Sequence, residues 1–261
     1  MVSKSKISQS FSKVASHYDK YAFLQRKLAH ELIEKIKNQN NIKYILDIGS
    51  GTGEICSILE KIFPQAKIFG CDIAFGMSLY AQKKYSDRTK IFFQQSDAEK
   101  LPYKKNCFDL VISNTSFQWI KNIKNLFVEI KNVLKPNGKI YFTTFGKESL
   151  LELISFFDKN NLDVEKINIC TLSIEKILKE LNFCNIKITS TKEKIFFPDS
   201  ISFLKWIKNI GSPSILNRSS GLFGKTLLFS LLHYYDHNFK ENNGVYATFE
   251  VIKGEAEKNE S

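Results

Sequence analysis

The chain has 261 residues, of which 43% are hydrophobic and 25% are charged. This balance is typical of a globular protein and excludes a disordered or collagen-like chain. Lysine and arginine outnumber aspartate and glutamate by 38 to 27, so the net charge is +11, which favours an anionic partner. Proteins that read DNA bases depend on arginine, and the three arginines here are Arg26, Arg88 and Arg218. We therefore do not expect a nucleic-acid partner.

The five cysteines form no Cys-x-x-Cys pair and have no histidine cluster beside them. We expect them to be free thiols of a reducing compartment, with neither a zinc site nor a disulfide framework. The first residues contain no apolar stretch of the kind found in secretion signals. No apolar run reaches the roughly 18–20 residues that a membrane span needs. The sequence thus indicates a cytoplasmic protein without a membrane partner.

The first half of the chain contains two different hydrophobic patterns, one after the other. Apolar residues recur at helical spacing within residues 1–38, which predicts helices there. Short β-branched and aromatic runs then predict strands at Tyr44–Ile48, Lys67–Asp72, Ile91–Gln94, Phe108–Ser113 and Lys139–Phe145. Helices are predicted between them at Glu54–Phe63, Met77–Tyr85 and Ile123–Leu134. Such alternation is typical of an α/β protein whose parallel sheet carries helices on both faces.

The pattern loosens after Phe145. Helices are predicted at Glu148–Phe157, Ser173–Leu181, Ser200–Ile210 and Leu222–Tyr235, and strands at Ile186–Thr191 and Tyr246–Ile252. The charged residues 254–261 are expected to form a disordered tail. No linker divides the chain, so residues 1–261 are interpreted as a single α/β domain with a helical insertion between its last two strands.

The most informative motif is Asp47-Ile48-Gly49-Ser50-Gly51-Thr52-Gly53-Glu54, because it follows a predicted strand and opens a helix. Its glycines permit positive φ angles and let a ligand approach the backbone. No lysine follows Gly53, as a nucleotide phosphate loop would require, and the spacing lacks the third glycine of a dinucleotide turn. The acid Asp47 disfavours a pyrophosphate and suits a ligand that carries an ammonium and a sulfonium. An ordinary loop turn is the alternative, but we favour S-adenosylmethionine.

Polar residues at the ends of the next strands agree with this ligand. Asp72 ends the second strand nineteen residues after Gly53, close to the roughly 20 expected for a carboxylate that binds ribose hydroxyls. Asp97 and Ala98 follow the third strand, where they can address the adenine edge. Asn114 follows the fourth strand, at the carboxyl edge where such sheets bind ligands.

Residues Ile45–Phe145 resemble a class I S-adenosylmethionine-dependent methyltransferase. The similarity narrows to the malonyl-acyl carrier protein O-methyltransferases, which open biotin synthesis in many bacteria. Three blocks carry the narrower match: Phe11 with Ala15-Ser16-His17-Tyr18-Asp19 and Leu24-Gln25-Arg26, Ser113-Asn114-Thr115-Ser116-Phe117-Gln118-Trp119, and Phe142-Thr143-Thr144-Phe145 with Ser149–Leu153. Similar residues recur in Ile207–Gly211 and Thr248–Ile252, so the likeness covers most of the chain.

The resemblance implies a Rossmann-like fold with a mostly parallel seven-stranded sheet, helices on both faces, an antiparallel last strand and a helical lid. Residues 1–38 would close the pocket, residues 39–146 would bind the cofactor, and residues 195–240 would form the substrate lid. It also implies roles for single residues. The methionine part of S-adenosylmethionine would be held by Asp47, Gly49, Gly51, Gly53 and Asn114; the ribose by Asp72; the adenine by Met77, Asp97 and Ala98; and Tyr18 would close the pocket.

The implied reaction is methyl transfer to the free carboxylate of malonyl-acyl carrier protein or malonyl-CoA. A malonyl carboxylate is ionised near neutral pH, so we predict neither a catalytic acid or base nor a metal. Tyr18, Trp119 and Arg218 are candidates for binding that carboxylate. The lysine excess would suit an acidic carrier protein, and we expect a monomer. Two alternatives remain: a small-molecule carboxyl methyltransferase of the trans-aconitate type, and a methyltransferase-like assembly or hydroxylase factor that transfers no methyl group.

Overall fold

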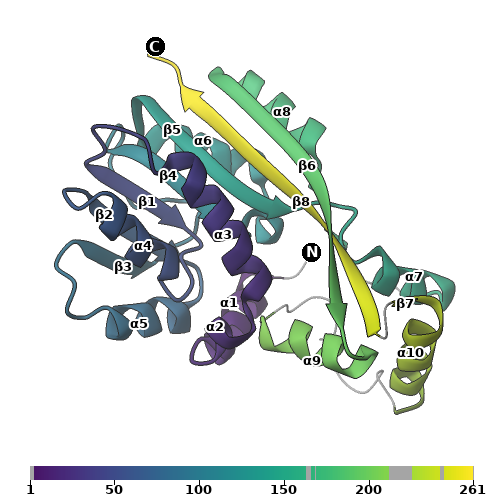
Figure 1. The fold of residues 1–261 in the computed structure, drawn as a ribbon. Helices are drawn as coiled ribbons and strands as arrows, with labels where there is room; N and C mark the ends of the chain where they lie inside the picture. Colours follow the sequence, from purple (N-terminus) through teal and green to yellow (C-terminus); the bar gives the residue numbers. More distant parts are fainter. Residues whose placement is uncertain (1–2, 163–165, 168, 212–224, 242–243, 261) are drawn as a thin grey trace.

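The computed structural model describes residues 3–162, 166–167, 169–211, 225–241 and 244–260 (Figure 1). The helices are α1 (Lys4–Val14), α2 (Tyr18–Tyr21), α3 (Phe23–Ile36), α4 (Glu54–Ile62), α5 (Phe75–Lys84), η1 (a short 3₁₀ helix, Phe117–Trp119), α6 (Ile123–Val133), α7 (Leu151–Lys159), α8 (Thr171–Glu180), α9 (Ser200–Asn209) and α10 (Lys225–Asn238). The strands are β1 (Tyr44–Ile48), β2 (Lys67–Asp72), β3 (Ile91–Gln95), β4 (Phe108–Asn114), β5 (Leu134–Phe145), β6 (Phe183–Phe197), β7 (Lys240–Glu241) and β8 (Gly244–Lys258).

One sheet organises the molecule, with the strand order β3-β2-β1-β4-β5-β8-β6. The strands from β3 to β5 run parallel, whereas β8 is antiparallel to both β5 and β6. The predicted α/β fold, with its mostly parallel sheet and antiparallel last strand, is confirmed. The sequence predicted seven strands. The two-residue β7, which pairs with the start of β8, adds an eighth.

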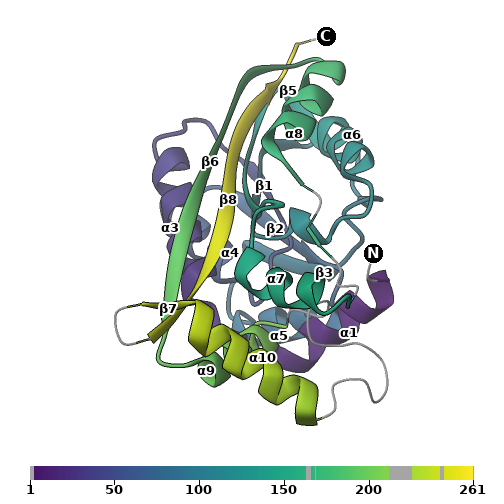
Figure 2. The ribbon, with the colours of Figure 1, turned by 90° about the vertical axis from the view of Figure 1, so that its right-hand side faces the viewer.

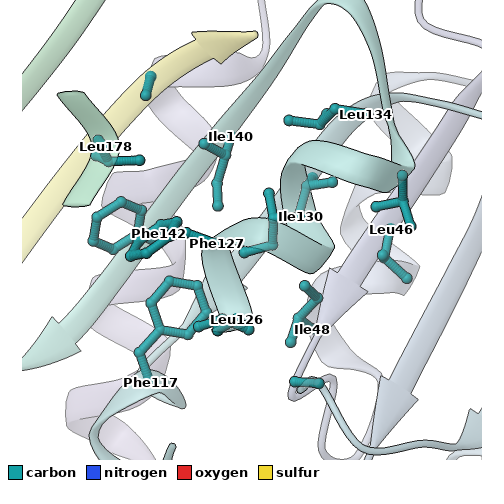
Figure 3. Close-up of a cluster of buried hydrophobic side chains, with 14 of the residues drawn as sticks. Leu46, Ile48, Phe117, Leu126, Phe127, Ile130, Leu134, Ile140, Phe142 and Leu178 are labelled. Atoms are coloured by element: carbon teal, nitrogen blue, oxygen red, sulfur yellow. The ribbon is translucent and has the colours of Figure 1, made fainter. Parts of the chain in front are cut away.

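Helices cover both faces of the sheet because neighbouring strand residues point to opposite sides. On β1, Ile45 is buried against α3 and α4, whereas Leu46 is buried on the side of α6 and α8. Along α6, Leu126, Phe127 and Ile130 recur at helical spacing and are fully buried against the sheet (Figure 3). Each face of the sheet thus has its own hydrophobic core.

The expected disordered tail at residues 254–261 is wrong for its first part. Gly254–Lys258 belong to β8 and pair with β5 and β6. Burial alternates along this segment with the two-residue period of a strand, although most of its side chains are charged. Gly254 and Ala256 are buried, whereas Glu255 and Glu257 are partly exposed. Glu255 lies 2.7 Å from the ammonium of Lys187 on β6, which compensates its charge.

In the range predicted as a substrate lid, residues 195–240, residues 195–197 belong to β6, and the described part of the rest contains α9 and α10. In Figure 2, α7, α9 and α10 gather at one end of the β6–β8 pair. Their apolar faces share a cluster of buried residues with Leu24 and Leu28 of α3 and Phe145 of β5. The Ser200 hydroxyl donates to Asp236 at 2.9 Å and joins α9 to α10.

The helices were also searched for a membrane span. Within the described ranges, none combines the length and the hydrophobicity that a membrane-spanning helix needs.

Candidate active site

A cavity lies at the carboxyl ends of β1, β2 and β4, with α1 on its outer side. Its wall includes nine of the residues that the sequence singled out: Tyr18, Gly49, Gly51, Asp72, Met77, Asp97, Ala98, Asn114 and Trp119. These residues come from segments spread over a hundred positions, and the parallel strands bring their ends together. Because the sequence predicts the cofactor at these residues, we call this space the cofactor cavity.

The glycine turn forms the floor of the cofactor cavity. Gly49 and Gly51 have positive φ angles of 73° and 54°, which residues other than glycine rarely adopt. A Cβ at Gly49 would lie 2.4 Å from the Cβ of Ser116, so glycine is required there for packing as well. A Cβ at Gly51 would meet no atom within 4 Å. The backbone at Gly51 therefore leaves room for a ligand to approach.

Asp72 lies at the end of β2 and is held by the turn. Its Oδ2 accepts a hydrogen bond from the Gly51 backbone N–H at 3.0 Å, and its Oδ1 accepts one from Ala74 at 2.7 Å. Burial raises the pKa of this carboxyl to about 6, although both backbone hydrogen bonds act in the opposite direction. The side chain is thus fixed in one orientation, and each oxygen keeps a lone pair for a hydroxyl donor.

Asp47 and Gly53 do not lie on the cavity wall. Asp47 is fully buried behind the turn, where Cys56 Sγ donates to its Oδ2 at 3.4 Å and its Oδ1 has no hydrogen-bond partner among the described residues. Burial, with a smaller contribution from the charge of Asp72, raises the pKa of Asp47 to about 7. A Cβ at Gly53 would lie 2.5 Å from the ring of Phe93, so this glycine serves the packing of the turn on β3.

Helix α1 supplies wall residues that the sequence did not assign to the site, namely Lys4 and Ile7. The Lys4 ammonium lies 2.7 Å from Asp97 Oδ2 and also pairs with Glu99. One turn further along, Ser8 donates to the Ile73 carbonyl at 3.0 Å. The amphipathic pattern of α1 predicted a helix, but the partners of its polar face lie some 65 to 95 positions away and could not be predicted.

Tyr18 stands at the start of α2, on the wall of the cofactor cavity. Burial and the nearby carboxylates of Asp72 and Asp19 raise the pKa of its hydroxyl, which therefore stays protonated and able to donate. Asp19 anchors this helix: it accepts from Thr52 of the glycine turn at 2.6 Å and from Lys84 of α5 at 2.7 Å. In the sequence, Asp19 was only part of a motif. In the structure, its side chain connects α2 to the glycine turn and to α5.

Asn114 lies on the wall of the cofactor cavity. Its amide donates to the backbone carbonyl of Gln25 on α3 at 2.9 Å, and its Oδ1 accepts from Thr143 of β5 at 2.6 Å. The Thr115 N–H in turn donates to Thr143 Oγ1 at 3.1 Å. The end of β4 is therefore tied to both α3 and β5.

A second cavity adjoins the first, and we call it the acceptor cavity. Four residues line both: Phe11, Tyr18, Thr115 and Trp119. The rings of Phe11 and Trp119 meet edge to face at 5.7 Å. Beyond this boundary the wall is mostly apolar and comes from α3, α7, α9, β5 and β8. Arg218, the third candidate for binding a carboxylate, lies outside the described residues.

Comparison with known proteins agrees with this geometry. The family model for a methyltransferase domain matches residues 46–142. A protein of Ilyobacter polytropus named malonyl-[acyl-carrier protein] O-methyltransferase 2 is 33% identical over 255 residues, which cover 97% of each chain. The chain belongs to the malonyl-[acyl-carrier protein] O-methyltransferase family. The resemblance drawn from the sequence is thereby confirmed.

Solved structures show the same fold. The YcgJ protein of Bacillus subtilis superposes with a TM-score of 0.64 at 15% identity. The superposition covers 89% of this chain and 100% of YcgJ. Phosphoethanolamine N-methyltransferase 2 of Haemonchus contortus, solved in complex with S-adenosyl-L-methionine, has a TM-score of 0.58 at 19% identity, covering 88% of this chain and 52% of that one. Members of the malonyl-[acyl-carrier protein] O-methyltransferase family are methyltransferases, so this chain is an enzyme of the S-adenosylmethionine-dependent class.

Proposed function

We propose that this protein transfers the methyl group of S-adenosylmethionine to the free carboxylate of a malonyl thioester, giving the methyl ester that enters biotin synthesis. The observation that carries the proposal is the pair of adjoining cavities. One is lined by the glycine turn and by carboxylates, the other is mostly apolar, and Tyr18 and Trp119 stand between them. A donor and an acceptor bound in such cavities would meet at that boundary.

The residues of the cofactor cavity fit S-adenosylmethionine. Gly51 has open space where a side chain would be, and Asp72 keeps lone pairs for the ribose hydroxyls. Asp97 and Ala98 would address the adenine beside Met77. Asp47 would act from behind the turn, through the charge of its carboxylate on the ligand's ammonium. When bound, the cofactor supplies an activated methyl group on a positively charged sulfur.

The acceptor needs little chemical activation. A malonyl carboxylate is already ionised near neutral pH, so its attack on the methyl group requires no general base, and we propose no metal. The protein has to align the reacting atoms and exclude water, and positioning of this kind supplies a large part of many enzymatic rate enhancements. The edge-to-face pair of Phe11 and Trp119 and the ring of Tyr18 would form the barrier to water at the boundary.

The remaining assignments are proposals of the same rank. The substrate would be carried by an acyl carrier protein or by coenzyme A, and α9 and α10 would cover its acyl chain as a lid. The helices of residues 1–38 would close the cofactor cavity. Cytoplasmic location and a monomeric state stay predictions.

A direct assay tests the proposal. Purified protein is incubated with isotope-labelled S-adenosylmethionine and malonyl-carrier protein, and the methyl ester is sought by mass spectrometry. Acetyl-carrier protein, which lacks the free carboxylate, is the control and should gain no label. Absence of ester with malonyl-carrier protein and with malonyl-CoA, despite measurable cofactor binding, would favour a non-methylating factor. Label on trans-aconitate instead would favour the small-molecule alternative.

A further inference from the structure

One fully buried polar atom among the described residues of the acceptor cavity wall has no hydrogen-bond partner. Gln25, in the first turn of α3, lines this cavity and is only 8% exposed, yet its Oε1 has no hydrogen-bond partner among the described residues. Buried polar atoms without partners are rare, since each of them loses the hydrogen bond that it makes with water in the unfolded chain. An unpartnered buried amide on a cavity wall indicates a group kept for a ligand.

The second glutamine of the cavity shows the contrast. Gln118 donates from Nε2 to the Thr115 carbonyl at 2.6 Å, and its Oε1 accepts from the Thr144 hydroxyl at 2.9 Å. Its amide is therefore engaged at both ends in holding the segment after β4 against β5. The Gln25 backbone carbonyl accepts from Asn114, which fixes the backbone at this position. Its Oε1 has no partner, and no hydrogen bond from its Nε2 is found among the described residues. A half turn about the last side-chain bond therefore breaks no hydrogen bond and exchanges the oxygen for the NH₂ group, which can donate.

The surroundings of Gln25 favour an anion. The residue lies in the first turn of a 14-residue helix whose N-cap, Ala22, supplies no side-chain hydrogen bond. A helix amino terminus carries a partial positive charge and favours negative groups. Among the described residues that line the acceptor cavity, none is lysine, arginine or histidine. An anionic substrate there would be met by neutral donors and by the end of α3.

Neutral donors suit the proposed reaction, on which this inference rests. One carboxylate oxygen forms the new bond to the methyl carbon, the sulfur–carbon bond breaks, and its electron pair stays on sulfur. No proton moves, and the charges of anion and sulfonium cancel as the methyl ester forms. A lysine or arginine paired with the carboxylate would stabilise the charge of the ground state more than the spread charge of the transition state, and so would slow the step.

We infer that the Gln25 side-chain amide binds the substrate carboxylate, donating to the oxygen that does not attack. Tyr18, which lines both cavities, is the second donor. Arg218 is then not needed for carboxylate binding. Gln25 is thus a specificity residue that distinguishes a malonyl group from an acyl group without a free carboxylate.

The test compares Gln25→Met with wild type on malonyl-carrier protein. The substitution keeps the length of the side chain and removes the donor, so kcat/KM should fall about 10- to 100-fold, which corresponds to one hydrogen bond to a charged group. Cofactor affinity by calorimetry should stay within twofold. Tm should stay equal or rise, because an unpartnered amide is replaced by an apolar group. Gln118→Met, the matched variant at an engaged amide, should lower Tm.

The substitution Gln25→Glu adds a second measurement, the pH dependence of kcat/KM, which would not change if Gln25 had only a structural role. Only the protonated acid can donate, and burial beside an anion raises the pKa of such a group. At saturating cofactor, the ratio of variant to wild-type kcat/KM should therefore fall at least about tenfold from pH 6 to pH 8.5. A flat ratio, or a Gln25→Met enzyme within threefold of wild type while Arg218→Met loses activity, would overturn the inference. Wild type forming no ester at all would instead refute the proposed function.

Discussion

The buried carboxylate of Asp47 gives a prediction whose magnitude follows from the structure. Asp47 is 0% exposed, and burial raises its pKa from 3.8 to about 7. A folded-state pKa above the unfolded one means that its contribution to stability is fully present below about pH 4 and is lost as the pH rises through about 7. At pH 8 the charge penalises the folded state by roughly 4 kcal/mol, and at pH 5 by roughly 2 kcal/mol, from about 1.4 kcal/mol per pKa unit.

The substitution Asp47→Asn removes that charge while the shape of the side chain is kept. We expect the stability difference between variant and wild type to move in favour of the variant by about 2–3 kcal/mol from pH 5 to pH 8. Any fixed penalty from the asparagine amide cancels in this comparison. Cofactor affinity should fall at least about tenfold at pH 8, and by less near pH 5, where wild-type Asp47 is itself protonated.

Urea unfolding of the ligand-free protein at the two pH values measures the first effect, and calorimetry with S-adenosylmethionine measures the second. Asp87→Asn is the control, because the Asp87 carboxylate is exposed. It should shift stability by less than about 0.5 kcal/mol at both pH values. If the Asp47→Asn difference were the same at pH 5 and pH 8, folding would not raise the pKa of Asp47, and the reasoning would be refuted.

Three further substitutions test single contacts. Tyr18→Phe should lower kcat/KM about tenfold with little change in Tm; wild-type kinetics would contradict a donor role for the hydroxyl. Gly49→Ala should destabilise the fold by about 1–3 kcal/mol in urea unfolding, and adding Ser116→Gly should restore only the part due to the clash. Lys4→Met removes the ion pair with Asp97, so stopped-flow measurements should show faster cofactor release. The free energy of unfolding should change by under about 1 kcal/mol, because the pair is partly exposed.

The glycine turn and the strand ends could be predicted from the sequence because their signals are local. A strand, a turn that needs positive φ and a following helix occupy consecutive residues, and Asp72 and Asn114 each close a strand. Parallel strands bring such ends to one edge without further information. The sequence could therefore place these residues together at one edge of the sheet. It could not tell which side of the turn the Asp47 side chain faces, and the role of Asp47 toward the methionine part of the cofactor stays a prediction.

The acceptor cavity could not be predicted in the same way. Its wall combines α3 with α7, α9 and the ends of β5 and β8, and no local pattern records their contacts. The end of β8 was not predicted for another reason. The charged composition of this segment suggested a disordered tail, although its hydrophobic pattern has the two-residue period of a strand. Glu255 and Glu257 resemble a solvated tail, yet the alternation with Gly254 and Ala256 is that of a strand with one buried face. The two-residue period is therefore the stronger signal in this segment.

The two cavities are mechanically linked through the end of β4. Asn114 lies on the wall of the cofactor cavity, and its side chain holds the backbone of Gln25, whose own side chain lines the acceptor cavity. Thr143 fixes the orientation of Asn114 by donating to its Oδ1. Because alignment of the reacting groups sets much of the rate in a transfer without acid or base, this chain of hydrogen bonds gives donor and acceptor a common frame. Asp19 does the same on the other side, by fastening the helix of Tyr18 to Thr52 of the glycine turn.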